Sequence, residues 1–469
     1  MQAVIEAEKA LTDQAFFGHP KGLAFLAFTE AWERFSYYGM TALLVLYMVN
    51  QLLLPGHIEN IAGFAAFRSA IESVTGPLST VALASQIFGL YAGFVYFTPV
   101  LGGMIADRWI GQRSAVVIGA LCMSAGHLAM TFDQSFLLAL LLLIIGSGFL
   151  KGNISAQVGA LYPVDEEARR TRGFAIFSVA INFGAVFGPL LCGWLAQVYG
   201  WHYGFGVAAI FMLCGLATYL YGYRYLPVRV DRRQQKNEKL SKTEWRIVAV
   251  LLAVMLVTLF QSVSYLQLFN IFPVWLQQSV NLNVGSFQVP VPWYQSIDAI
   301  FSILAVPVLF WIWRFRANHG GEASDLSKIG MGAWLTVLNN LVLVFAIHQA
   351  NGAPIHPALP ALYCAGMGVS FLYYWPTLLA LVSRAAPASA NATMMGVTFM
   401  TLFVANNVVG WLGRYYEQMS NGSFWTMHAA IAAAGGLLVL IFGRILDRLL
   451  STAEPQPLRP SAMTIEVET

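Results

Sequence analysis

The sequence predicts an all-α polytopic membrane protein whose twelve transmembrane helices form two six-helix bundles. Of the 469 residues, 58% are hydrophobic and only 10% are charged, and the mean hydropathy is +0.63. Apolar runs of about 20 residues, the length that crosses a bilayer, recur from Leu23 to Leu450. A polar, basic stretch at 226–244 separates six of these runs from the other six. This composition excludes an ordinary soluble protein.

The spans follow one another with mostly short polar connections. In the N-terminal half we expect them at 23–53, 78–105, 114–131, 136–161, 173–198 and 203–225. In the C-terminal half we expect them at 245–276, 292–313, 329–347, 357–382, 393–412 and 424–446. The predicted parts of the chain are an N-terminal bundle (1–225), a basic cytoplasmic linker (226–244), a C-terminal bundle (245–450) and a disordered cytoplasmic tail (451–469).

Basic residues gather in alternate connections and near the C-terminal end, as Arg232 and Arg233 do in the linker. Because the cytoplasmic connections of membrane proteins are enriched in Lys and Arg, this pattern places both termini in the cytoplasm. Residues 1–21 show no separate apolar core of a cleavable signal peptide, which agrees with this orientation. The predicted location is a bacterial inner (plasma) membrane.

The first span carries three charged residues, Glu30, Glu33 and Arg34. They lie on one helix face, because positions i, i+3 and i+4 are neighbours. Charge inside a bilayer is costly and usually faces a water-filled cavity or a partner. The spacing therefore favours an ion or substrate pathway along this helix. The alternative is a purely structural ion pair.

The connection between the second and third spans combines the paired glycines Gly102 and Gly103 with Asp107, Arg108 and Arg113. Glycines permit close helix approach, and the charged residues can hold neighbouring helix ends in one conformation and release them in another. The pattern resembles the signature loop of the major facilitator superfamily. The resemblance implies a gating role for the acid and the two arginines; the alternative is a loop that only anchors the topology.

The segment from Glu30 to Met40 resembles the signature helix of the proton-dependent oligopeptide transporters, the peptide and nitrate branch of that superfamily. The resemblance continues through 149–153 on the fourth span and through 174–177 and 182–185 on the fifth. It covers the whole N-terminal half and the C-terminal half in outline. It implies a major facilitator fold and proton-coupled uptake of small peptides.

Lys151 is a lone cation in the apolar fourth span. An unpaired charge there would be costly by several kcal/mol, so Lys151 needs an anion. The resemblance implies that the fourth span faces the first, which makes Glu30 and Glu33 the expected partners. A carboxylate that pairs with a lysine in one conformation and loses it in another has two proton affinities, as proton coupling requires. We therefore predict Glu30, Glu33 and Lys151 as proton-coupling residues.

Substrate binding is expected from Arg34 and from Lys151. A guanidinium stays charged and can hold a carboxylate through two parallel hydrogen bonds, which suits a peptide C-terminus. Arg34 could instead merely neutralise Glu30, and the two roles could alternate. Further binding residues are predicted to be aromatic side chains with polar tips and one short amide, whose backbone contact the resemblance implies: Tyr37, Tyr38, Tyr91 and Asn182.

The second half departs from the family. Its peptide transporters usually carry acids on spans seven and ten, whereas here span seven has no carboxylate and Phe371 stands at the usual acid of span ten. The remaining intramembrane acid is Asp298 on span eight. We predict that Asp298 binds the peptide amine or takes a proton; the alternative is a helix cap or a local pair near the outer surface.

No nucleotide-binding loop, zinc pattern or pairing of nucleophile with base is recognised, so we expect no enzyme activity, no cofactor, no metal and no nucleic-acid partner. The predicted function is a monomeric proton-coupled symporter that imports di- and tripeptides by alternating access. Two alternatives are a related facilitator for another small solute, such as nitrate or a drug-like amphoteric compound, and a non-transporting peptide receptor.

Overall fold

A computed structural model describes residues 15–163, 166–227, 240–321, 323–387 and 389–451 of the chain, and most of these residues are helical. The predicted linker at 226–244 lies largely outside the described residues, and the predicted tail at 451–469 lies outside them after Ser451. The division into four parts therefore stays a prediction. The helices themselves can be compared with the predicted spans.

In the first half the elements fall within a few residues of the predicted spans. Short 3-10 or π turns, labelled η, extend several of the α-helices. The elements are α2 (Lys21–Tyr47), η1 (Met48–Leu52), η2 (Ile58–Asn60), α3 (Phe64–Thr75), α4 (Thr80–Ile105), η3 (Ala106–Ile110), α5 (Gln112–Ala129), η4 (Asp133–Ser135), α6 (Phe136–Ala160), α7 (Glu167–Tyr199), α8 (Trp201–Gly222) and η5 (Tyr223–Tyr225).

The second half follows the same plan and adds a short antiparallel hairpin between its first two spans. Its elements are α9 (Lys242–Leu266), η6 (Gln267–Phe269), α10 (Ile271–Ser279), β1 (Asn283–Val284), β2 (Phe287–Gln288), α11 (Trp293–Gly320), α12 (Asp325–Ala350), α13 (Ala358–Ala385), α14 (Asn391–Leu412), η7 (Gly413–Tyr415) and α15 (Asn421–Ser451).

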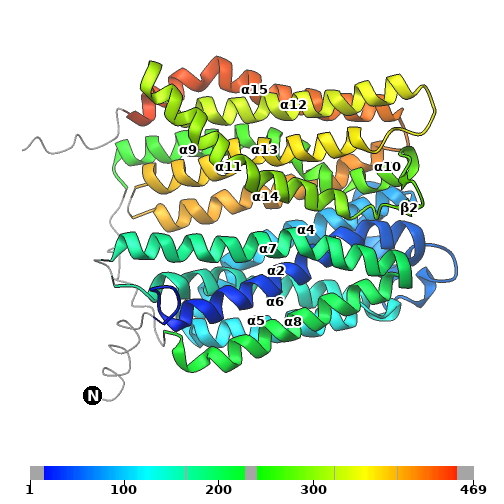
Figure 1. Cartoon of the computed structure of the whole chain (residues 1–469), viewed down its shortest axis with the longest axis horizontal. Coiled ribbons are helices and arrows are strands. Elements are labelled where there is room, and N and C mark those ends of the chain that lie inside the picture. Colours follow the sequence, from blue (N-terminus) through cyan, green and yellow to red (C-terminus); the bar gives the residue numbers. More distant parts are fainter. Residues whose placement is uncertain (1–14, 164–165, 228–239, 322, 388, 452–469) are drawn as a thin grey trace, which may run out of the picture.

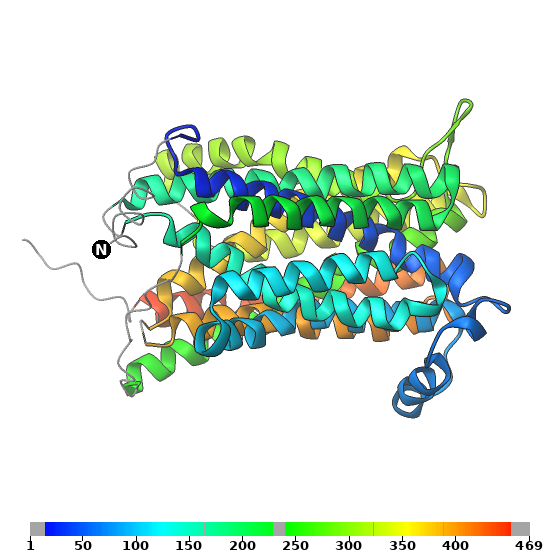
Figure 2. The ribbon, with the colours of Figure 1, turned by 90° about the horizontal axis from the view of Figure 1, so that it is seen from below.

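The long helices run side by side in two groups, with the first-half helices in one and the second-half helices in the other (Figure 1). Both the start of α2 and the end of α15 lie at one end of the molecule, which we call the terminal end (left in Figure 1). Helix α3 and the hairpin lie at the opposite end, which we call the loop end, and Figure 2 shows α3 standing out from the bundles there.

Ten helices of the described residues are long and apolar enough to cross a membrane. Two more, α2 and α5, have 27 and 18 residues and are more polar. Helix α2 owes this polarity to Lys21, Glu30, Glu33 and Arg34. The predicted all-α polytopic membrane fold is thus confirmed.

One predicted span is not continuous. The span expected at 245–276 breaks at Asn270, between η6 and α10, where the backbone leaves helical geometry with φ −110° and ψ −86°. Pro273 lies in the first turn of α10, where its missing N–H would in any case have no helical partner. A continuous helix would lose that hydrogen bond in its interior, so the proline favours a new helix start.

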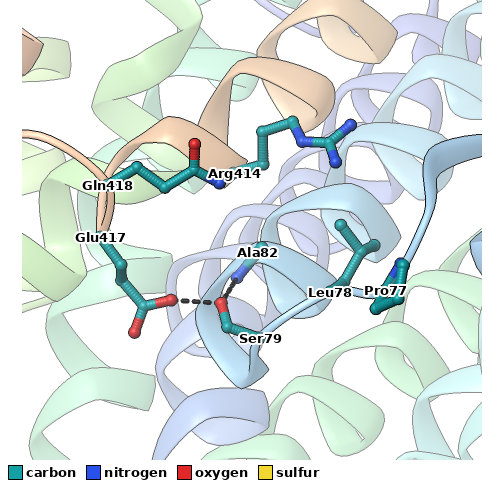
Figure 3. A pocket seen from close by; sticks show the side chains of 7 residues that line it. All are labelled: Pro77, Leu78, Ser79, Ala82, Arg414, Glu417 and Gln418. Atoms are coloured by element: carbon teal, nitrogen blue, oxygen red, sulfur yellow. Dashed lines mark hydrogen bonds between the residues drawn. The ribbon is translucent and has the colours of Figure 1, made fainter.

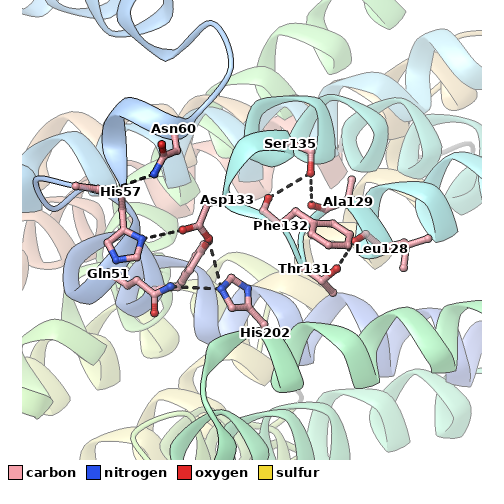
Figure 4. A network of polar contacts seen from close by, with 12 residues as sticks. Gln51, His57, Asn60, Leu128, Ala129, Thr131, Phe132, Asp133, Ser135 and His202 are labelled. Carbon is pink, nitrogen blue, oxygen red and sulfur yellow. Dashed lines mark hydrogen bonds and ion pairs between the residues drawn. The ribbon is translucent and has the colours of Figure 1, made fainter.

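At the loop end, the Asp133 carboxylate joins three parts of the first half (Figure 4). The Tyr47 hydroxyl donates to Oδ1 at 2.5 Å, and Nδ1 of His57 lies 2.9 Å from Oδ2. Nε2 of His202 lies 3.5 Å from Oδ1 and 3.3 Å from Nε2 of Gln51. The end of α2, the connection after η1 and the start of α8 are therefore all held to the α5–α6 connection by one carboxylate.

Replacing Asp133 by alanine is expected to destabilise the fold by roughly 1.5–3 kcal/mol, because hydrogen bonds to a charged group are among the stronger ones. The apparent unfolding midpoint in detergent, measured at a fixed heating rate, should fall. Glu59→Ala is the control, since Glu59 is exposed and accepts one local backbone hydrogen bond. Equal midpoints for the two variants would contradict a structural role of this network.

Candidate functional site

The charged face of α2 is placed by close packing against α7. A Cβ atom on Gly184 would lie 2.4 Å from Cβ of Arg34, and one on Gly188 would lie 2.5 Å from the carbonyl oxygen of Phe35. Only glycine allows the two backbones to approach this closely. The α2–α7 contact therefore fixes the position from which the side chain of Arg34 extends.

Arg34 binds both predicted carboxylates. Its Nε lies 2.7 Å from Oε1 of Glu30 and 2.7 Å from Oε2 of Glu33. The three residues are buried, with exposed fractions of 3% for Glu30, 0% for Glu33 and 8% for Arg34. Among the described residues, Oε2 of Glu30 and Oε1 of Glu33 have no hydrogen-bond partner. When both glutamates are ionised, the triad has one more negative than positive charge. It is therefore suited to bind a proton or a second cation.

Lys151 on α6 lies beside this triad and contacts aromatic rings. Its Nζ is 4.2 Å from the ring centroid of Tyr37 and 5.5 Å from that of Tyr96. Among the described residues no carboxylate lies within ion-pair distance of this ammonium. The expected pairing with Glu30 or Glu33 is thus absent in this conformation, in which both acids pair with Arg34 instead. Pairing in another conformation stays a prediction.

The other predicted residues of the first half lie near the same place to different degrees. The ring of Tyr38 is 5.3 Å from that of Tyr37, in an edge-to-face arrangement. Tyr91 on α4 is buried. Asn182 on α7 is half-buried, two residues before Gly184, and its role is not decided by these contacts.

The second half contributes Asp298, which lies five residues after the start of α11. The Tyr265 hydroxyl donates to Oδ2 of Asp298 at 3.0 Å, and Oδ1 has no partner among the described residues. A helix cap at the outer surface does not describe this buried carboxylate. The hydrogen bond to Tyr265 is a local contact within the second half, and binding of the peptide amine or a proton by Asp298 stays a prediction.

Two aromatic residues that contact the predicted charges were not predicted from the sequence. Tyr96 lies beside Lys151, and Tyr265 binds Asp298. A signal existed for Tyr265, since it lies among polar residues in an apolar span, between Ser264 and Gln267. Tyr96 follows Tyr91 by five residues and offered no signal beyond its residue type.

The predicted gating residues lie at the terminal end. Asp107 and Arg108 are exposed on η3, which continues α4. The guanidinium carbon of Arg113 lies 4.8 Å from the ring centroid of Tyr223, in η5 after α8. Arg113 therefore contacts its own bundle here, and gating by the three residues stays a prediction.

Hydrogen bonds between the two bundles gather toward the loop end. They join Asn50 to Gln277, Ser79 to Glu417, Ser85 to Gly410, Val186 to Ser296, Leu190 to Trp293, Gln197 to Gln288, Ser85 to Asn270 and Thr75 to Arg414. The bundles are therefore closed on each other at that end.

A pocket of about 100 Å³ marks one of these contacts, between the start of α4 and the segment after α14 (Figure 3). Arg414 donates from Nη2 to the carbonyl oxygen of Thr75 at 2.8 Å, and Ser79 donates to the carboxylate of Glu417. On the first-half side, Arg68 lies 3.0 Å from Glu72, which also accepts from the backbone N–H of Leu78. That N–H and Arg68 lower the pKa of Glu72, so the carboxylate stays ionised in mildly acidic medium.

Known proteins resemble this chain in both sequence and fold. A family model described as the Major Facilitator Superfamily matches residues 23–410. The peptide transporter YePEPT of Yersinia enterocolitica is 26% identical over 94% of this chain and 98% of its own length. A di-/tripeptide transporter of Lactococcus lactis subsp. cremoris is 27% identical over the same shares.

The fold agrees as well. A crystal structure of a mutant of the peptide transporter POT, in complex with alafosfalin, has a TM-score of 0.82 and 25% identity and covers 96% of this chain and 99% of its own. A POT family transporter in complex with 5-aminolevulinic acid has a TM-score of 0.80 at 22% identity, over 93% and 99%. The chain belongs to the major facilitator superfamily and is related to its bacterial peptide transporters.

Proposed function

We propose that this protein is a proton-coupled symporter that imports di- and tripeptides across a bacterial inner membrane by alternating access. The observation that carries the proposal is the buried triad of Glu30, Glu33 and Arg34, which lies beside Lys151, while the other bundle contributes the buried Asp298. The peptide transporters among its relatives support the substrate class. We propose that the protein acts as a monomer.

The charges suit a bipolar substrate. A peptide carboxylate can bind the two cations of the first half, Arg34 and Lys151, and a peptide ammonium group can bind Asp298. When a substrate carboxylate takes part of the Arg34 contact, the hold of Arg34 on the two glutamates weakens. A carboxylate that loses a cation binds a proton more readily, so substrate binding and proton binding become linked.

The orientation follows from the basic connections, which we propose to be cytoplasmic together with both termini. The loop end then faces outward, and its hydrogen bonds close the site to the outside. Transport requires these bonds to break and re-form as the bundles rock about the site. The pair of Thr75 and Arg414 is one of the contacts that would hold this closed state.

Arg414→Ala is expected to shift the population toward the outward-open state by about 2–10-fold, since one hydrogen bond contributes roughly 0.5–1.5 kcal/mol. The shift is measured as the rate at which a membrane-impermeant maleimide labels an introduced Ala82→Cys. This rate should be higher when Arg414→Ala is also present, after the labelling of the same protein without that cysteine has been subtracted. Gln418→Ala is the matched control, because Gln418 lines the same pocket. Unchanged labelling in Arg414→Ala would contradict the assigned role.

The function itself is tested in proteoliposomes that are alkaline inside and acidic outside. Accumulation of labelled dialanine that a protonophore abolishes is the expected result. Binding of dialanine without accumulation would indicate a receptor. Failure both to bind and to transport dialanine, with retained transport of another amphoteric solute, would indicate a different facilitator.

A further inference from the structure

Three helices of the second half meet at Asp298. Tyr265 comes from the end of α9, Asp298 from the start of α11, and Phe371 from the middle of α13. Tyr265 and Asp298 are buried, with exposed fractions of 5% and 6%. The hydrogen bond from the Tyr265 hydroxyl to Oδ2 of Asp298 is therefore shielded from bulk water.

The ring of Tyr265 is held by other aromatic rings. It stacks on Phe371, with the centroids 5.3 Å apart and the planes 28° from parallel. Tyr374 contacts it edge-on at 6.1 Å and Phe269 at 5.8 Å. Offset stacking and edge contacts at such distances are favourable, and neighbours on several sides restrict the phenol to few orientations. Phe371 thus contributes to aiming the Tyr265 hydroxyl at Asp298.

The backbone of Asp298 is fixed independently. A Cβ atom on Gly368 would lie 2.3 Å from the carbonyl oxygen of Asp298, so α11 and α13 pack closely only because residue 368 is glycine. The Ser302 hydroxyl donates to the same carbonyl at 2.9 Å and lies 3.1 Å from the carbonyl oxygen of Gly368. The side chain of Asp298 consequently extends from a rigid base.

The carboxylate is only half satisfied. Oδ2 accepts from Tyr265, whereas Oδ1 is buried without a hydrogen-bond partner among the described residues. A buried carboxylate oxygen without a partner is costly, and a donor that reaches it is bound correspondingly well. The donor must be cationic or neutral, and a substrate ammonium group meets both the charge and the hydrogen-bond requirement.

We propose that Tyr265, held in place by Phe371, is a positioning residue that presents Oδ1 of Asp298 to the ammonium group of the substrate. The proposal rests on the proposed function of Asp298. It makes the aromatic pair a determinant of specificity: substrates with a free amino terminus are favoured over the same substrates with a blocked one. The aromatic residue at position 371 would thus support the acid on α11.

The experiment compares dialanine with N-acetyl-dialanine, which lacks the ammonium group, as competitors of labelled dialanine uptake in proteoliposomes. The parent protein is expected to prefer dialanine. Tyr265→Phe keeps the ring and removes the hydroxyl, so it should raise the KM for dialanine by about tenfold, change kcat by less than about twofold, and leave inhibition by the blocked peptide unchanged.

Phe371→Leu tests the other half of the pair, since it keeps the hydroxyl and removes the stacking surface. Like Tyr265→Phe, it should reduce the preference for dialanine over N-acetyl-dialanine, but by a smaller factor. The variant with both substitutions should have the same KM for dialanine and the same preference over N-acetyl-dialanine as Tyr265→Phe alone, because both residues act through one hydrogen bond. Tyr363→Phe is the matched control: Tyr363 is fully buried in the same bundle, and its hydroxyl has no partner among the described residues.

The outcomes separate this proposal from the proposed function. Asp298→Asn that leaves dialanine affinity unchanged, or a parent protein without preference for the free amine, overturns the role of Asp298. Loss of affinity in Asp298→Asn together with an unchanged preference in Tyr265→Phe overturns the positioning role alone. An equal loss for both peptides in Tyr265→Phe also overturns it, because a general packing defect does not distinguish the amine. If Tyr265→Phe fails to fold, Phe371→Leu tests the positioning role instead: an unchanged preference for dialanine over N-acetyl-dialanine in that variant overturns it.

Discussion

Replacement of Glu33 by glutamine is expected to abolish proton-driven dialanine uptake while counterflow exchange of dialanine continues. Glutamine has nearly the shape of glutamate, but its amide group cannot bind and release a proton as a carboxylate does. Glu33 is fully buried and pairs with Arg34, so its ionisation changes the charge of the whole triad. The loss of driven uptake should be at least about a hundredfold, as for removal of a required proton carrier.

The measurement uses one preparation for both reactions. Driven uptake is followed under a pH gradient, and exchange is followed with dialanine on both sides and no gradient. Glu59→Gln, an exposed acid at the loop end, should behave as the parent protein. Unchanged driven uptake in Glu33→Gln would show that the proton assignment is wrong, and loss of both reactions in a folded protein would make Glu33 a binding residue.

Arg34→Lys is expected to raise the KM for dialanine by about a hundredfold or more even though the charge is kept. The Nε of Arg34 lies 2.7 Å from a carboxylate oxygen on each side, and the guanidinium keeps further N–H groups for a substrate carboxylate. A lysine ammonium is a single point charge and cannot reproduce this fork. Lysine keeps the charge but has no Nε to make the two 2.7 Å contacts with Glu30 and Glu33, so the apparent unfolding midpoint should also fall.

The control is Arg68→Lys, which alters a partly exposed ion pair with Glu72 on α3. Such pairs contribute about 0–1 kcal/mol, so its KM and unfolding midpoint should stay close to those of the parent. A lysine at position 34 that supports parental KM would contradict the proposed grip on the substrate carboxylate. It would leave Arg34 as a neutraliser of Glu30, the alternative that the sequence also allows.

The first-half site could be predicted largely from local spacing. Glu30 and Arg34 are four residues apart on a helix, so their contact needs no information from other helices. The choice made by Lys151 could not be predicted in the same way. Its ammonium could contact a carboxylate or an aromatic ring, and the packing of the helices decides between them. In this conformation it contacts the ring of Tyr37, while Glu33 pairs with Arg34.

The second-half site shows the opposite balance. The sequence singled out Asp298 because an acid in an apolar span is rare. Its partner Tyr265 is 33 residues away on another helix, and the stacking of Tyr265 on Phe371 brings in a third helix. Neither contact follows from residue spacing, because helix rotation and the close α11–α13 approach at Gly368 decide which side chains meet.

The sequence by itself determined that this is a polytopic membrane protein, where its helices approximately begin and end, and which residues share the charged face of α2. The physical reason is that span length and helical periodicity can be evaluated for each segment without its neighbours. Only the tertiary structure decided the break at Asn270, the aromatic surroundings of Lys151 and Asp298, and the closure of the bundles at the loop end. Each of these features depends on contacts between side chains of different helices. Several partners are possible for each side chain, and the relative positions of all the helices determine which of them it contacts.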